Sequence, residues 1–374
     1  MPIDAQAAPA SPSRSETEAR RTLVAAGVRL LDEGLVARTW GNISLRLGPA
    51  TFLVSPSGVP WREVRPEDLS IVNIADLAWE GARRPSSERG LHGMIYAAFP
   101  ETGAVIHTHQ TAISPWIAAR LPLEVPAALR ARLGPSLPVA AYALPGTPAL
   151  ARAALRAFEA APRSPAVLLA NHGLVARGAD LEDAFRVAES VEALCAGLLP
   201  PLPPPPGRPD PAPASGGLEE FIAVLGELRP GAFVHHSTRP WTLAFSAGGR
   251  PLRPLLDDLA QLGGISFTIL PFAPRGGAPG RRRALARALG SSRGFRSREA
   301  LLVEGRGALC LGADAEEAGT VAQVLEKGAL AVLGAEGLGG GRPLSSLDAA
   351  YMRWYYLRHY RNRGAGPARG PSGR

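Results

Sequence analysis

Apolar positions along the first 200 residues recur with two different periods, which predict an alternation of helices and strands. Helical spacing links Leu23, Ala26 and Leu30, and it links the apolar positions of 184–194 again. A further helix is expected over 91–98, after a turn-like segment. Short apolar runs bounded by turn residues predict strands at 43–47, 51–54, 69–74, 104–106 and 167–170. This alternation is typical of an α/β protein.

The segment 200–216 divides the chain. Its run of prolines (PPLPPPPGRPDPAPASG) favours polyproline II and cannot join a packed core. We therefore expect a folded domain over 16–199, a semi-rigid linker over 200–216 and a second domain over 217–363. The small and polar ends, 1–15 and 364–374, are expected to be disordered tails.

The second domain repeats part of the first. Residues 165–195 align with 299–329 without gaps, and 11 of these 31 positions are identical, including the Gly-Ala-Asp turn at 178–180. Upstream, residues 103–107 resemble residues 231–235. A shared turn followed by the same helix indicates a tandem duplication.

Composition narrows the functional classes. The 374 residues are 46% hydrophobic and 20% charged, which allows buried cores and excludes wholesale disorder. The net charge of +8 is carried almost wholly by arginine, and the basic cluster 281–283 has no interleaved aromatic residue, so we expect no nucleic-acid partner. The single lysine, Lys327, lies in a patterned helix far from other chemical residues, which argues against a Schiff-base enzyme.

The same sequence gives expectations about location. Two cysteines cannot form a disulfide framework, and the first residues contain no apolar signal region. Uncharged stretches are broken by Gly and Pro, so no membrane-spanning helix is expected. These features predict a cytoplasmic protein without a membrane partner.

Three histidines follow two of the predicted strands. His107 and His109 are two positions apart after the run 104–106, and side chains two apart on a strand face the same way. His172 directly follows the run 167–170. Three neutral imidazoles suit a borderline cation such as zinc and leave a coordination position open for catalysis.

Glu88 stands at a predicted helix start, where it could ligate a metal, act as a general base or merely favour the helix dipole. Small hydroxyl residues next to glycine occur nearby, in GNIS (41–44), SPSG (55–58) and the pair Ser86–Ser87. Backbone N–H groups and hydroxyls of such turns can converge on a phosphate. Each turn alone has low specificity.

Taken in order, GNIS, SPSG, SSE, HTH and NHG resemble the class II aldolase/adducin family over about residues 18–198. The resemblance implies a three-layer α/β/α domain with a central mixed, mostly antiparallel sheet, here duplicated in tandem. It implies one zinc ion per chain, held by His107, His109, His172 and Glu88, with Glu88 also moving protons. It further implies a clamp for the phosphate of a small phosphorylated sugar, formed by Asn42, Ser57, Gly58, Ser86 and Ser87. His92, one helical turn after Glu88, is interpreted as mainly structural.

This resemblance implies a metal-dependent lyase of the aldolase type, which cleaves a ketose 1-phosphate through a metal-stabilised enediolate. Related epimerases tend to carry aspartate at the position of Glu88, so glutamate favours aldol cleavage. An epimerase, dehydratase or decarboxylase of a sugar phosphate or sugar acid remains an alternative, as does a non-catalytic adducin-like binding protein. A complete set of three histidines and a glutamate argues against the binding protein.

Two departures from the family pattern bear on the mechanism. The family's aldolases carry a tyrosine acid between HTH and the APY-like segment, but residues 110–141 contain no tyrosine. The aromatic stretch around 351–360 is expected to pack as a helix, although it is a local source of a replacement tyrosine. In the second domain, 235–237 (HHS) replaces HTH and Arg306 replaces His172, so no second metal is expected.

The family places its active site where one subunit meets the next. We therefore expect a homo-oligomer in which the second domain, tethered by the linker, packs as a pseudo-subunit against the first.

Overall fold

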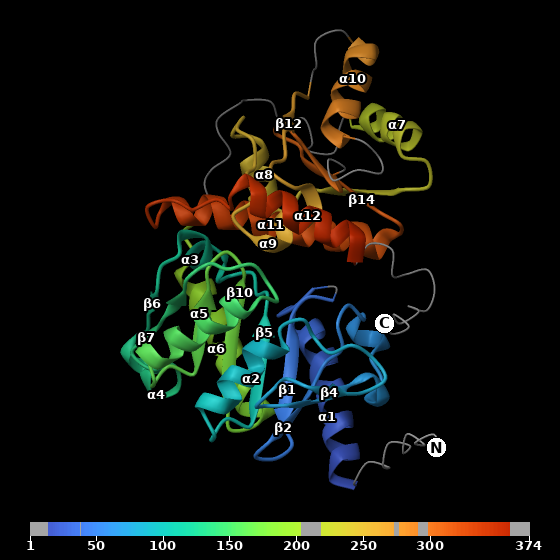
Figure 1. Ribbon diagram of the computed structural model, residues 1–374. Helices are drawn as coiled ribbons and strands as arrows, with labels where there is room; N and C mark the ends of the chain where they lie inside the picture. The colour runs from blue at the N-terminus through green and yellow to red at the C-terminus, as the bar shows by residue number, and fades with distance from the viewer. Residues whose placement is uncertain (1–13, 38, 203–217, 273–276, 291–297, 360–374) are drawn as a thin grey trace, which may run out of the picture.

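The computed structural model describes residues 14–37, 39–202, 218–272, 277–290 and 298–359. These residues form a first unit (14–202) and a second unit (218–359), which pack against each other (Figure 1). The proline-rich stretch from 203 and both expected tails lie outside the described residues, except that the first helix already begins at Arg14.

The first unit is built on an eight-stranded sheet with the order β4-β3-β2-β1-β5-β10-β9-β8. Within the described residues, β8 and β9 pair in parallel and the other neighbours pair antiparallel. The strands of this sheet are β1 (Asn42–Arg46), β2 (Thr51–Val54), β3 (Ser70–Asn73), β4 (Trp79–Glu80), β5 (Ala104–Thr108), β8 (Val139–Ala140), β9 (Ala166–Leu169) and β10 (Gly173–Gly178). β6 (Leu123–Glu124) and β7 (Ser136–Leu137) form a separate pair. The sheet is therefore mixed and mostly antiparallel, as the resemblance implies.

Helices cover both faces of this sheet and make three layers. Apolar side chains of α2 and α5 pack on one face, and those of α1, α3 and α6 pack on the other. The helices of the first unit are α1 (Arg14–Asp32), α2 (Arg89–Ala98), α3 (Ser114–Ala119), α4 (Arg130–Leu133), α5 (Pro148–Ala160) and α6 (Leu181–Leu198), with short 3-10 turns at Trp61–Glu63, Pro66–Asp68 and Ala127–Leu129. The strands and helices expected from hydrophobic spacing are present within a few residues of their expected bounds.

The second unit reproduces half of this plan. Its four-stranded sheet has the order β11-β14-β13-β12, with two antiparallel neighbours and one parallel pair, as in β5-β10-β9-β8. Its strands are β11 (Phe233–Ser237), β12 (Ile269–Leu270), β13 (Ala300–Val303) and β14 (Gly307–Gly312), and its helices are α7 (Glu219–Leu228), α8 (Pro240–Ser246), α9 (Asp257–Gly263), α10 (Gly277–Leu289), α11 (Ala315–Glu336) and α12 (Ser346–His359). Strands equivalent to β1–β4 are absent from the described part of this unit. The described part of the second unit therefore matches half of the first unit, which supports the duplication indicated by the sequence.

Equivalent side chains make the same local contacts in both units. Asp180 accepts a hydrogen bond from the backbone N–H of Asp183 at the start of α6, and Asp314 caps α11 through Glu317 in the same way. Such caps satisfy N–H groups that a helix end leaves unpaired. The repeat detected in the sequence therefore preserves turn chemistry as well as apolar spacing.

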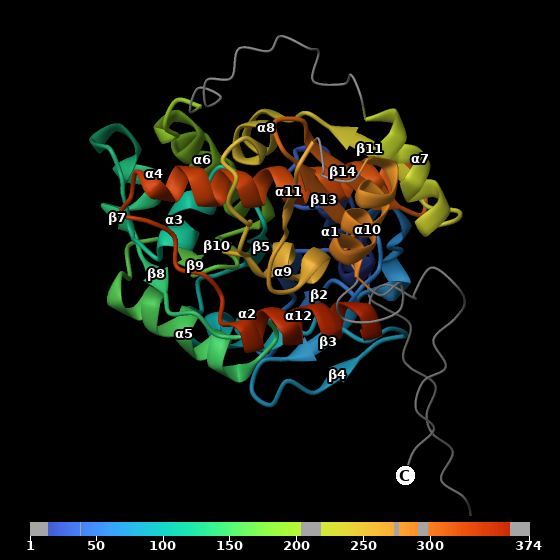
Figure 2. The ribbon, with the colours of Figure 1, turned by 90° about the horizontal axis from the view of Figure 1, so that it is seen from above.

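The two units share one hydrophobic core. A single cluster of buried side chains runs from α1, α3 and α6 of the first unit to α8, α9 and α11 of the second. Helix α11 lies along α3, and α9 and α12 complete the layer that faces the first unit (Figure 1 and Figure 2). The backbone N–H of Arg342 also donates to the carbonyl of Ala118 at 2.8 Å. None of the helices described here has both the length and the apolar character of a membrane span.

The contact between α11 and α3 requires a glycine. A Cβ atom at Gly334 would lie 2.6 Å from Cγ of Pro115, whereas a Cβ at Gly319 of the same helix would meet no atom within 4 Å. We predict that Gly334→Ala lowers the free energy of unfolding by about 1–3 kcal/mol because the proline ring cannot yield.

The matched control is Gly319→Ala, which should raise the free energy of unfolding by about 0.5–1 kcal/mol through helix propensity alone. Urea denaturation of both variants measures the difference. Equal effects of the two substitutions would show that α11 does not depend on this close approach.

Candidate metal centre

His107 and His109 are positioned by the central strand β5. Val105 packs into the core beneath α2 and α5, so residues 105 and 107 share that face, and His109 continues it just past the strand end. β1 and β10 flank β5, with Asn42 opposite His107 on one side and Val175 opposite it on the other. The two imidazoles therefore project from the middle of the sheet, as their spacing predicts.

His172 reaches the same point from the tight turn between β9 and β10. Asn171 adopts a left-handed conformation with φ of 59°, and His172 donates its backbone N–H to Leu169 at 3.0 Å. The next position, 173, requires glycine, because a Cβ atom there would lie 2.2 Å from the carbonyl oxygen of Thr108. The Asn-His-Gly sequence thus allows β10 to approach β5 closely and carries His172 to the other two histidines.

The three imidazoles converge in a buried cluster. One ligand nitrogen from each of His107, His109 and His172 can be chosen so that all three lie within 4.8 Å of one another. Nε2 of His107 is 3.0 Å from Nε2 of His109, and the ring of His172 stacks on that of His107 with centroids 4.8 Å apart. Across the described residues this is the single group of three or more side chains arranged to hold a metal ion.

Glu88 lies beside these histidines at the start of α2. Its Oε2 is 3.3 Å from Nε2 of His107, and its Oε1 is 3.2 Å from Nε2 of His172. Asn42 donates its side-chain N–H to Oε2 at 2.8 Å and contacts His92 through its carbonyl oxygen. Nδ1 of His92 lies 2.6 Å from the hydroxyl of Ser44, so Asn42 and the fully buried His92 orient the carboxylate.

Two of the three turns expected to bind phosphate, 55–58 and 86–87, lie on loops that are joined to each other. The backbone N–H of Ser57 donates to the carbonyl of Arg84, and that of Ser86 donates to the carbonyl of Ser55. The Ser86 hydroxyl accepts from the N–H of Glu88 at 3.2 Å, so Ser86 is engaged inside the loop. Of the other expected clamp residues, Ser57 and Ser87 are partly exposed on the joined loops, and Gly58 has φ of 70°.

The second unit contributes charged side chains that sequence reasoning missed. Asp257 Oδ2 lies 3.0 Å from Nδ1 of His172, and Asp258 Oδ2 lies 3.8 Å from Nδ1 of His109. Lys327 donates to Asp258 at 2.8 Å and to the backbone carbonyl of His109 at 2.9 Å. The expectation that Lys327 lies far from the chemistry is therefore wrong. The signal available in the sequence was that one lysine persists in a chain whose other strong bases are all arginine.

Burial and nearby charges shift the pKa values of this cluster in different directions. Burial lowers the pKa of His107 to about 4 and that of His109 to about 3. Burial alone would raise the pKa of Glu88, but the adjacent His107 and His172 hold it well below its usual range. Burial also opposes the charging of His172, yet Glu88 and Asp257 raise its pKa to about 10. The electrostatic field at His172 therefore favours a positive charge.

Unpaired polar atoms show that the cluster fits a metal ion. No donor or acceptor among the described residues forms a hydrogen bond with Oε1 of Glu88 or Nε2 of His172, although both atoms are buried. Nδ1 of His107 lies 2.8 Å from the carbonyl oxygen of Leu174, which fixes the proton on that nitrogen and leaves Nε2 as an acceptor. Buried polar atoms are rarely left unpaired. A divalent cation bound by imidazole nitrogens and a carboxylate would satisfy this donor set.

In the second unit, the positions equivalent to the three histidines carry other combinations of residues. The strand register also shows that the alignment expected from the sequence is wrong by one residue. His236 pairs with Leu309 as His107 pairs with Val175. A Cβ at Gly307 would lie 2.2 Å from the carbonyl oxygen of Ser237, matching Gly173 over Thr108. The segment equivalent to HTH is therefore 236–238 (His-Ser-Thr) and not 235–237, because the short apolar run could be aligned in either register.

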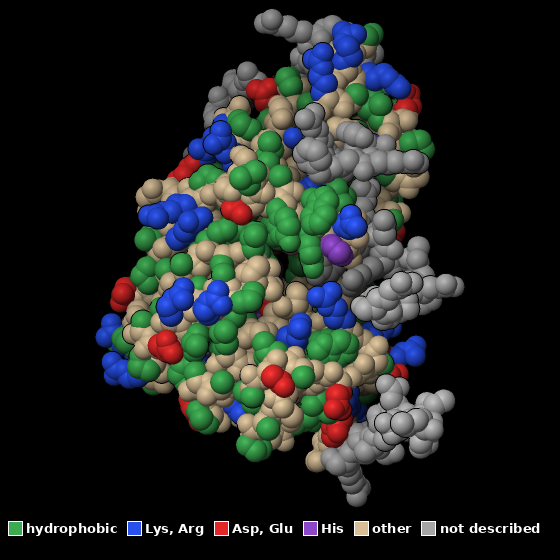
Figure 3. All heavy atoms as spheres, viewed as in Figure 1, with side chains coloured by type: hydrophobic (Ala, Val, Ile, Leu, Met, Phe, Trp, Pro, Cys, Tyr) green, Lys and Arg blue, Asp and Glu red, His purple; other side chains and the backbone are tan. Residues whose placement is uncertain are grey.

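Aromatic residues of the second unit lie along α12. Tyr356 is buried, whereas Tyr351 and Trp354 are 44% and 45% exposed. Figure 3 shows hydrophobic side chains gathered on this helix, between the two units. Tyr360 lies outside the described residues. The tyrosine that is linked to the histidine cluster comes from the first unit instead. It is Tyr142, whose hydroxyl donates a hydrogen bond to Oδ1 of Asp257 at 3.1 Å.

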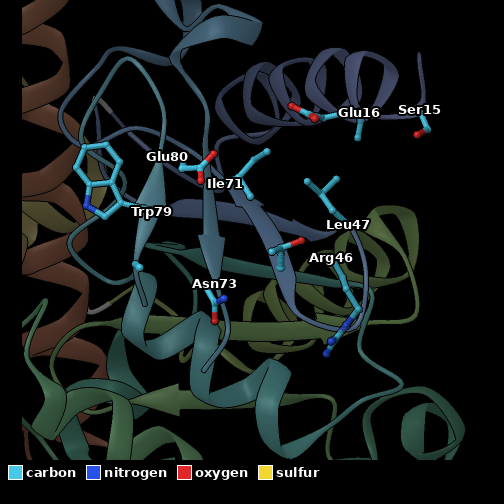
Figure 4. A pocket seen from close by; sticks show the side chains of 11 residues that line it. Ser15, Glu16, Arg46, Leu47, Ile71, Asn73, Trp79 and Glu80 are labelled. Atoms are coloured by element: carbon cyan, nitrogen blue, oxygen red, sulfur yellow. The ribbon is translucent and has the colours of Figure 1, made fainter. Parts of the chain in front are cut away.

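An open pocket elsewhere on the first unit contains none of these groups. It lies between α1 and the outer strands of the sheet and is lined by side chains such as Glu16, Arg46 and Trp79 (Figure 4). Arg46 is held by the backbone carbonyls of Thr102 and Tyr96 at 2.7 Å each.

Comparisons with known proteins identify the family of this chain. The profile of the Class II Aldolase and Adducin N-terminal domain matches residues 21–199 and, a second time, residues 208–333. The 5-deoxy-D-ribulose 1-phosphate aldolase of Bacillus thuringiensis serovar kurstaki is 40% identical over 178 residues, which cover 46% of this chain and 80% of that relative. The methylthioribulose-1-phosphate dehydratase of Methylococcus capsulatus is 34% identical over 181 residues, with coverages of 46% and 88%. Among solved structures, an L-fuculose 1-phosphate aldolase is 33% identical, with a TM-score of 0.46 and coverages of 50% and 85%.

Because the profile matches well over half of the chain, and does so twice, the family expected from the sequence motifs is confirmed. The chain belongs to the class II aldolase and adducin N-terminal domain family.

Proposed function

We propose that this chain is a metal-dependent lyase that cleaves a ketose 1-phosphate by an aldol reaction. The observation that carries the proposal is the buried convergence of three imidazoles with a carboxylate whose Oε1 atom forms no hydrogen bond with the described residues. The names of both curated relatives specify a derivative of ribulose 1-phosphate, so a 5-deoxyketose 1-phosphate is the substrate class we propose to assay first. The products would be dihydroxyacetone phosphate and an aldehyde.

His107, His109 and His172 would hold the ion, with Glu88 beside them, and zinc is the ion that three neutral imidazoles favour. Such an ion supplies positive charge that stabilises the negative charge developing on the ketose oxygens as the carbon–carbon bond breaks. The broken bond leaves its electron pair on the carbon next to the carbonyl, and that carbon must then gain a proton.

Glu88 is the group we propose for this proton transfer. Asn42 binds one carboxylate oxygen, which leaves the other oxygen oriented and able to carry a proton. The joined loops that carry Ser57, Gly58 and Ser87 would hold the phosphate, while Ser86 and Asn42 keep these loops and Glu88 in place. Fixing the phosphate fixes the position of the reacting carbon relative to Glu88.

The dehydratase relative supports one alternative. In that reaction a carboxylate such as Glu88 would remove the proton next to the carbonyl, and water would leave from the adjacent carbon without cleavage of the chain. Product analysis separates the two reactions, because dehydration releases no triose phosphate. Release of dihydroxyacetone phosphate and an aldehyde supports the aldolase proposal, and loss of water alone contradicts it.

The metal site predicts a specific stoichiometry. Purified full-length protein should carry about one divalent ion per chain, and His107→Ala should remove most of it because a ligand nitrogen is lost. His236→Ala is the matched control, since His236 occupies the position of His107 in the second unit. Elemental analysis of both variants after equal exposure to zinc measures the effect. Two ions per chain, or equal losses in both variants, would contradict the proposed site.

If Glu88 transfers the proton, its substitution should lower turnover much more than metal binding. Glu88→Gln should retain most of the metal but lower kcat by about 10²–10⁴-fold, the range typical of a general acid–base. Glu192→Gln is the control, because Glu192 is a partly buried glutamate of the same unit but accepts the backbone N–H of Ala112 at 2.8 Å. Near-normal turnover of Glu88→Gln on a substrate that the wild type cleaves would return Glu88 to a structural role at the start of α2.

A further inference from the structure

The second unit reaches the histidines through the start of α9. Asp257 and Asp258 are the first two residues of this helix, and both carboxylates are almost completely buried. Asp257 contacts His172 at 3.0 Å, whereas Asp258 lies 3.8 Å from His109 and is joined to Lys327 of α11. Two of the three imidazoles therefore face carboxylates that come from outside the first unit.

The backbone around Asn171 fixes this contact. The Asn171 side-chain N–H groups donate to the carbonyls of Leu255 and Arg342, at 2.7 and 2.8 Å. The backbone carbonyl of Asn171 accepts the N–H of Asp257 at 2.9 Å. The residue that precedes His172 is thus bound to the second unit at three points, which sets the position of Asp257 relative to the His172 ring.

The hydrogen bond from His172 to Asp257 determines which nitrogen of the His172 ring carries the proton. Oδ2 of Asp257 lies 3.0 Å from Nδ1 of His172, and a carboxylate oxygen in this position accepts the hydrogen bond that Nδ1 donates. This leaves Nε2 as the nitrogen of His172 that can ligate a metal ion, and Nε2 is buried and faces Oε1 of Glu88 at 3.2 Å. Tyr142 donates to the second oxygen of Asp257 and prevents the carboxylate from turning away.

We infer that Asp257 is a positioning residue for the metal centre, and that Lys327, paired with Asp258, holds the backbone of His109 in place. This inference rests on the proposed function. The second unit would then complete the centre of the first unit within one chain, by orienting two ligands while providing none itself. It gives the contacts at α9 and α11 a role, although the described residues of the second unit include no equivalent of β1–β4 and Thr238 and Arg306 stand at two of the ligand positions.

The test measures metal affinity rather than activity, in the full-length protein. Asp257→Ala and Asp257→Asn are compared with the wild type by competition for zinc with a chelator of known affinity. Removal of a carboxylate that orients a ligating histidine weakens metal binding by about 10–100-fold, and this is the loss expected for Asp257→Ala. Asp257→Asn keeps an accepting oxygen for Nδ1 but not the charge, so its affinity should fall between the other two.

The control is Glu299→Gln, because Glu299 is also a buried carboxylate of the second unit but pairs with Arg353 at 3.1 Å. Its zinc affinity should equal that of the wild type even if its unfolding midpoint falls. If Asp257→Ala does not fold, the nearly isosteric Asp257→Asn still decides the question.

The possible outcomes are distinct. Ordered losses at Asp257 with unchanged affinity in Glu299→Gln support the inference. Wild-type affinity in both Asp257 variants would overturn it while leaving the proposed function intact. Failure of the wild type to bind any divalent ion would overturn the proposed function and this inference together.

Discussion

The organisation of this chain depends on pairing polar groups that are buried in an apolar core. Three imidazoles and three carboxylates meet near the centre of the first sheet, where an unpaired charge would cost several kcal/mol. Strand alternation, the Asn-His-Gly turn and the start of α2 bring Glu88 and the histidines together. Asn42 and Lys327 then pair carboxylate oxygens that would otherwise be buried alone.

The described residues of the second unit keep only part of the plan of the first unit. It keeps the half-sheet, the capped helix after the Gly-Ala-Asp turn and the apolar surface that merges with the first unit. The strands that would flank β11 on its open side are absent from its described residues. The faces retained are those that continue into the common core and reach the histidines.

Much of the first unit could be predicted from its sequence because the information is local. Period-two spacing placed His107 and His109 on one face, and the order of five short motifs indicated both the family and the mixed sheet. The contacts of Asp257, Asp258 and Lys327 could not be predicted in this way. They join segments 69 to 218 residues apart, and no local period describes how two units pack.

The alignment expected for β11 of the second unit was wrong for a different reason. Two adjacent histidines offered two alignments with the strand of the first unit, and apolar spacing alone could not choose between them. The close approach of Gly307 to Ser237 decides the register, and this is a property of neighbouring backbones. The spacing along one strand therefore predicts which of its residues share a face. It does not predict which residue of the neighbouring strand lies opposite each of them.

The lone lysine has a practical consequence. Its ammonium fits between a backbone carbonyl and a carboxylate, a site for a compact point charge that the wider, planar guanidinium of arginine matches poorly. Lys327 is only 4% exposed, and it bears the one primary amine found on any side chain of this sequence. An amine-specific reagent can reach it only when α11 moves away from His109. Covalent labelling of this residue, followed by mass spectrometry, therefore reports how often the two units separate in solution.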